Sequence, residues 1–115
     1  MLKLWQAFGY SLAGLKSAFQ SEFAIKLEVV FMVILTPLII MLDFTMLQKA
    51  ILIFAMLVVF MAELVNTAIE ALANTITRDI HPGIKKAKDI GSAVVFVALV
   101  NFVMLSGLFL NAAYY

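Results

Sequence analysis

Residues 50–62 read AILIFAMLVVFMA, an uncharged apolar run that passes directly into ELVNTAIE at residues 63–70. About 20 predominantly apolar residues span a bilayer as a helix, and the run reaches that length when it continues into the second stretch. Within that stretch Glu63, Asn66 and Glu70 are spaced i, i+3 and i+7, which places them on one helical face. The sequence therefore predicts a membrane helix that ends in one polar stripe.

The composition of the whole chain excludes an ordinary soluble domain. Of its 115 residues, 65% are hydrophobic and 13% are charged, against about 45–50% and about 25% in soluble domains. A chain this short cannot bury so many apolar side chains inside itself, so lipid must cover the rest. The net charge of +1 predicts no nucleic-acid partner, and the lack of cysteine excludes disulfides and thiolate metal sites. We predict one integral membrane domain over residues 1–115.

Three transmembrane helices are expected, at about residues 25–42, 47–76 and 85–110. Pro37 lies inside the first span, where a proline can kink the helix. The fold class is therefore an all-α membrane protein.

Residues 2–20 resemble neither a signal peptide nor a span. Their large apolar side chains recur three and four residues apart, at Trp5, Phe8, Leu12, Leu15 and Phe19. This pattern predicts an amphipathic helix. It can lie on the inner leaflet or pack its apolar stripe on the transmembrane bundle, and both can hold.

Basic residues are distributed unevenly around the spans. Lys49 alone lies between the first and second spans, and the remaining seven are Lys3, Lys16, Lys26, Arg78, Lys85, Lys86 and Lys88. Lysine- and arginine-rich flanks stay in the cytoplasm. We therefore expect a multi-pass membrane protein with its amino terminus in the cytoplasm and its carboxyl terminus outside.

Carboxylates within a span indicate function, because a charged group at mid-bilayer costs about 2.5–3.5 kcal/mol on insertion scales. Seven residues separate Glu63 from Glu70 by about 10 Å along the helix, too far to share one cation. We expect Glu70, with an acid from the first segment, to hold Mg²⁺ together with phosphate oxygens. The more deeply placed Glu63 suits a general base for a hydroxyl at the membrane surface. Alternatively, each acid is paired to a lysine or asparagine across helices.

No standard nucleotide motif accompanies these acids, since the five glycines fit neither G-x-x-x-x-G-K-[ST] nor G-x-G-x-x-G. Phosphates would have to be held by a metal ion, by Lys88 and neighbouring lysines, and by free amides at the start of the third span. The charged residues are expected to gather in one interfacial layer, where a lipid headgroup meets a soluble cosubstrate.

Three stretches carry a resemblance to a known family: GYSLAGLK at residues 9–16, ELVNTAIE at residues 63–70 and KKAKDIGSA at residues 85–93. With these, the chain resembles the small bacterial integral-membrane diacylglycerol kinases, whose relatives include undecaprenol kinases. The resemblance covers nearly the whole chain. It implies three spans and an amphipathic amino-terminal helix in a homotrimer with composite active sites, located in the bacterial inner (cytoplasmic) membrane. It also implies transfer of phosphate from ATP, with Mg²⁺, to diacylglycerol, giving phosphatidic acid.

Matching by position implies roles for individual residues. Glu63 matches the catalytic base, Glu22 and Glu70 match the acids that hold Mg²⁺, and Asn66 matches a residue that helps to order the site. Lys88 would neutralise the transferring phosphate. The implied ATP contacts are Tyr10, Glu22, Glu70, Asp79, His81, Lys88 and Asp89. The implied lipid contacts are Lys3, Ala24, Ile25, Lys26, Leu27, Glu28, Glu63 and Ser92.

Three positions depart from the family's pattern. Ser21 stands where asparagine is usual, Asn74 replaces a frequent acid, and Lys3 stands where arginine is common. The fine geometry of the metal and lipid contacts is therefore open.

Other positions indicate which lipid the chain phosphorylates, because two branches of the family differ there. Gly91-Ser92-Ala93 and Glu28 resemble the diacylglycerol-phosphorylating branch, whereas residues 66–70, His81-Pro82 and Lys85-Lys86 are common in the undecaprenol branch. Diacylglycerol is the preferred prediction, and undecaprenol is the alternative.

An alternative hypothesis from another functional class is a small cation- or proton-conducting oligomer whose pore is lined by Glu63, Asn66 and Glu70. A pore requires polar lining along a full span, whereas residues 50–62 are wholly apolar. The kinase is therefore favoured.

Overall fold

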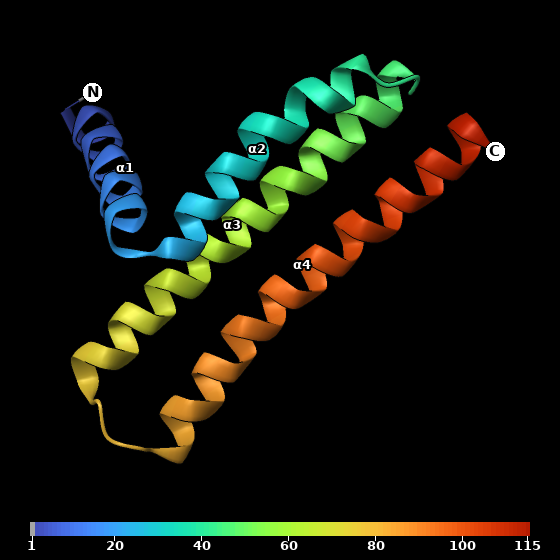
Figure 1. The fold of residues 1–115 in the computed structure, drawn as a ribbon. Helices are drawn as coiled ribbons and strands as arrows, with labels where there is room; N and C mark the ends of the chain where they lie inside the picture. The colour runs from blue at the N-terminus through green and yellow to red at the C-terminus, as the bar shows by residue number, and fades with distance from the viewer. Residues whose placement is uncertain (1) are drawn as a thin grey trace.

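The structure, a computed structural model, describes residues 2–115 and consists of four α-helices joined by short connections (Figure 1). They are α1 (Leu2–Ser21), α2 (Phe23–Met41), α3 (Met46–Ile76) and α4 (Pro82–Tyr114). Three of them, α2, α3 and α4, are long and apolar enough to cross a membrane. The prediction of an all-helical chain with three candidate spans is confirmed.

A tight connection turns α2 back along α3. Thr45 begins α3 with a capping box, in which its hydroxyl accepts from the Gln48 N–H at 3.1 Å and its own N–H donates to the Gln48 side chain at 3.0 Å. Ile39, Phe44 and Leu52 are buried together beside this turn. The turn thereby fixes where α2 and α3 begin to pack.

The two longest helices, α3 and α4, lie side by side along most of their length (Figure 1). Their shared core consists of Val59, Ala62, Val95 and Ala98. At one end, the Asp43 N–H donates to the Tyr114 hydroxyl at 3.1 Å, which ties the end of α4 to the α2–α3 turn. At the other end, α4 begins with Pro82, a residue suited to the first position of a helix.

The amino-terminal end of α2 reaches only about the middle of α3 (Figure 1). The second half of α3 therefore lies beside α4 on one side and near α1 on another. α1 leads away from the start of α2, and it borders a groove with residues 64–71 of α3. The predicted apolar stripe of α1 is exposed in this arrangement, from 70% at Trp5 to 44% at Phe19. That stripe is therefore available to a lipid surface or to another chain.

Candidate active site

The predicted polar stripe occupies one face of the second half of α3. Glu63, Asn66 and Glu70 are all half-buried. The Asn66 Nδ2 donates to Glu70 Oε1 at 3.3 Å, while Asn66 Oδ1 is buried and has no hydrogen-bond partner within residues 2–115. The amide group is thus oriented by Glu70, since its nitrogen must face the carboxylate.

Acids from the start of α2 approach this stripe. Glu63 lies close enough to Glu22, Glu28 and Glu70 for their charges to interact. Glu22 occupies the N-cap position of α2, but its side chain makes no capping hydrogen bond. The Glu22 carboxylate is therefore not bound to the backbone at the start of α2. Unscreened carboxylates gathered in this way repel one another, and such an arrangement attracts cations.

A lysine from α4 completes the polar layer. Lys88 Nζ donates to Asn74 Oδ1 at 2.7 Å, and both residues are half-buried. Asn74 lies one helical turn beyond Glu70, so the bond places the ammonium group of Lys88 at the end of the acidic stripe. The sequence did not indicate that Asn74 holds Lys88.

The other predicted ATP contacts have different surroundings within one chain. Asp89 forms an exposed ion pair with Lys85 at 2.7 Å. His81 Nδ1 accepts from the Gly83 N–H at 3.1 Å and so caps α4. The Asp79 side chain is exposed in the loop before α4, and Tyr10 is 75% exposed on α1. The structure thus brings Glu22, Glu63 and Glu70 close together, with Lys88 at the end of their stripe. The exposed residues are Tyr10, Asp79, His81 and Asp89.

The predicted lipid contacts are mostly exposed. Ala24, Lys26, Leu27, Ser92 and Lys3 offer surface, and Glu28 is half-buried. Ile25 differs, because it is only 1% exposed and packs inside the chain. Within one chain Ile25 therefore presents almost no surface, and its contact with lipid stays a prediction.

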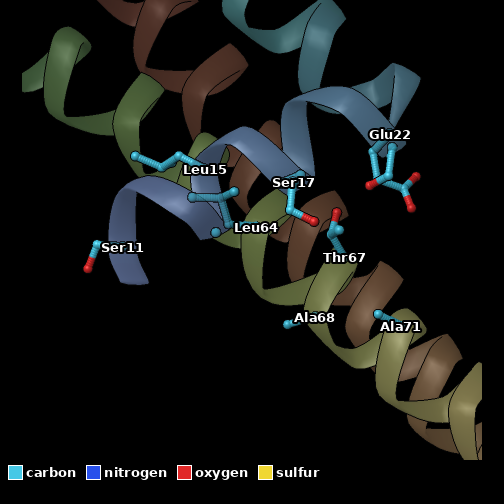
Figure 2. Close-up of a pocket in the computed structure, with 11 residues that line it drawn as sticks. Ser11, Leu15, Ser17, Glu22, Leu64, Thr67, Ala68 and Ala71 are labelled. Atoms are coloured by element: carbon cyan, nitrogen blue, oxygen red, sulfur yellow. The ribbon is translucent and has the colours of Figure 1, made fainter. Parts of the chain in front are cut away.

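Two hollows adjoin the acids. A groove of about 590 Å³ lies between α1 and α3, with Ser17 and Thr67 on facing walls and Glu22 at one end (Figure 2). A smaller crevice of about 180 Å³ runs between α2, α3 and α4, and its lining includes the charged Glu28 and the apolar Met56 and Phe102. Sequence reasoning did not predict either hollow, because both depend on how helices cross.

Comparison with known proteins decides the family. Residues 9–110 match the family model described as prokaryotic diacylglycerol kinase. The chain belongs to this family. The prediction of membership is confirmed.

Relatives share most of their length with the chain, and each is named diacylglycerol kinase. The Pseudomonas aeruginosa protein is 41% identical over 97 residues, covering 84% of this chain and 79% of the relative. The Haemophilus influenzae protein is 42% identical over 90 residues, covering 78% and 76%. A Helicobacter pylori protein is 31% identical over 112 residues, covering 97% and 88%.

Family membership makes the chain a lipid kinase, a phosphotransferase with an alcohol acceptor. The prediction of an enzyme is confirmed. Three apolar helices and a membrane kinase family fit a protein of the inner membrane.

Proposed function

We propose that the chain transfers the γ-phosphate of ATP to the free hydroxyl of diacylglycerol at the cytoplasmic membrane surface. The observation that carries the proposal is the polar layer itself: Glu63, Asn66 and Glu70 share one face of α3, and Lys88 is held at its end by Asn74. A base, a cation-binding acid and a phosphate-binding cation are the groups that phosphoryl transfer requires.

The donor set fits magnesium, with Glu22 and Glu70 as the proposed ligands. Both are carboxylates, the hard oxygen donors that Mg²⁺ prefers. Within residues 2–115 no three acidic or histidine side chains are gathered into a metal cage. Mg²⁺ needs only one or two protein carboxylates when phosphate oxygens and water complete its shell. When bound with ATP, the ion would neutralise charge on the phosphates.

Each proposed step uses a group of this chain. Glu63 accepts the proton of the lipid hydroxyl while the oxygen of that hydroxyl forms a bond to the γ-phosphorus of ATP. The bond from that phosphorus to the bridging oxygen of the β-phosphate breaks, and ADP leaves. Lys88 balances negative charge on the transferring group, while Asn66 keeps Glu70 oriented. Positioning and charge neutralisation supply most of the acceleration in such transfers.

A homotrimer with composite sites is part of the proposal. The outer face of α4 carries large apolar side chains, with Phe96 at 66% and Val97 at 65% exposure, which is surface for lipid or for other copies. Asp89 is exposed and paired with Lys85, and Tyr10 is 75% exposed on α1. A neighbouring copy that supplied such residues would complete the nucleotide contacts.

We also propose a cytoplasmic amino terminus and an outer carboxyl terminus, with α1 lying along the inner leaflet. Lysine and arginine cluster in α1, at the start of α2, in the loop between α3 and α4, and in the first two turns of α4, which favours that orientation. The exposed apolar stripe of α1 is the feature that a membrane surface would cover.

Diacylglycerol is the proposed lipid, and undecaprenol is the alternative. The proposal is supported by Glu28, by Gly91-Ser92-Ala93 and by the relatives, which are named diacylglycerol kinases. Residues 66–70 and His81-Pro82 favour the alternative.

The test is phosphate transfer from labelled ATP with Mg²⁺ by the full chain in mixed micelles. Diacylglycerol and undecaprenol are offered separately, and triacylglycerol, which has no free hydroxyl, is the matched lipid control. We expect labelled product on diacylglycerol alone. Product on undecaprenol alone would overturn the proposal that diacylglycerol is the substrate. No product on either lipid would overturn the proposed kinase activity.

A further inference from the structure

Gly91 of α4 lies against the polar stripe at a point where a side chain does not fit. A Cβ atom on Gly91 would lie 2.5 Å from Asn66 Oδ1 and 3.4 Å from Ile69 Cδ1. Carbon and oxygen atoms approach one another to only about 3.3 Å even in weak C–H···O contacts. Gly91 is also buried. Its lack of a side chain is therefore what lets the α4 backbone reach Asn66.

Asn66 cannot move away from Gly91 without consequence. Its Nδ2 donates to Glu70 Oε1 at 3.3 Å, and its buried Oδ1 lies where the Gly91 Cβ would be. The side-chain amide is a rigid planar group, so a displacement of Oδ1 also displaces Nδ2. Any group that pushes Oδ1 from α4 therefore disturbs the bond to Glu70.

We propose that Gly91 is a positioning residue for Glu70 and acts through Asn66. The missing side chain at Gly91 leaves room for the Asn66 rotamer that donates to Glu70, and this bond fixes the orientation of a carboxylate proposed to bind Mg²⁺. The inference rests on the proposed function, because the role of Glu70 as a magnesium ligand comes from there. The packing of α4 on α3 thus determines the affinity for metal and nucleotide.

The direct test is Gly91→Ala, with Gly107→Ala on the same helix as its control. A Cβ on Gly107 meets nothing within 4 Å, so only the first substitution creates a clash. Both substitutions raise helix propensity alike. Full-length protein in mixed micelles is titrated with Mn²⁺ and a non-hydrolysable ATP analogue, and bound Mn²⁺ is measured by electron paramagnetic resonance. We expect binding about tenfold weaker in Gly91→Ala, the effect of losing one hydrogen bond to a charged group, and unchanged binding in Gly107→Ala.

The Asn66→Ala background separates positioning from general packing. Asn66→Ala alone should weaken binding by the same factor, and Gly91→Ala should then add nothing, because the clash and the hydrogen bond are both gone. Equal losses from Gly91→Ala in the two backgrounds would overturn the proposal. Unchanged binding in Asn66→Ala would overturn it even if Gly91→Ala failed to fold. Since binding is measured without phosphate transfer, this failure is distinct from failure of the lipid-kinase proposal.

Discussion

Replacing Asn74 by leucine should lower the catalytic efficiency with MgATP without disturbing the fold. The substitution removes the oxygen that accepts from Lys88 Nζ at 2.7 Å. A hydrogen bond to a charged group contributes about 1.5–3 kcal/mol, and the lower end applies because both residues are only half-buried. About 1.4 kcal/mol corresponds to a factor of ten. We therefore expect kcat/KM for MgATP to fall about tenfold as Lys88 loses its fixed position.

The assay is steady-state transfer to lipid in mixed micelles over a range of MgATP concentrations. Asn74→Asp is the conservative variant, and it should stay near wild type because a carboxylate also accepts from Lys88. Thr75→Val is the matched control, because the Thr75 hydroxyl donates only to the Ala71 carbonyl of its own helix, at 2.8 Å. A wild-type kcat/KM in Asn74→Leu, or an equal loss in Thr75→Val, would refute the reasoning.

Three further predictions concern Glu70, His81 and Thr45. Glu70→Gln should raise the Mg²⁺ concentration needed for half-maximal activity about tenfold, because a neutral amide is a weaker ligand than a carboxylate; an unchanged magnesium titration would contradict its role as a ligand. His81→Ala should lower the free energy of unfolding by about 1 kcal/mol through loss of the α4 cap. A rise in the KM for ATP in this variant would indicate that His81 also contacts the nucleotide. Thr45→Ala should cost about 0.5–2 kcal/mol of stability through loss of the capping box and leave KM unchanged, which thermal unfolding and kinetics together would check.

Features set within one helix were predictable from the sequence. The spacing of Glu63, Asn66 and Glu70 fixes their common face, because a helix has 3.6 residues per turn whatever surrounds it. The apolar runs likewise predicted three candidate spans, which the structure has. These features need only the backbone geometry of a single segment.

Features that join two helices were not predictable. The bond from Lys88 to Asn74 links residues 14 apart in the chain across the α3–α4 hairpin, and the fit of Gly91 against Asn66 depends on how closely α4 approaches α3. The burial of Ile25 was likewise not predictable, because apolar residues occupy nearly every face of α2 and do not reveal which side packs within the chain. Crossing angle and axial offset come from packing of many side chains together.

Glu63 is proposed to remove the hydroxyl proton, while Glu70 is proposed to hold the magnesium ion of the nucleotide. The most direct measurement compares kcat for lipid phosphorylation with Mn²⁺–nucleotide binding in Glu63→Gln. Asp43→Asn, an exposed acid in the α2–α3 turn, is the matched control. General base catalysis contributes about 10²–10⁴-fold, so kcat should fall by that factor in Glu63→Gln while nucleotide binding stays at the wild-type value. A kcat near wild type, or a loss of nucleotide binding equal to the loss of kcat, would contradict the account.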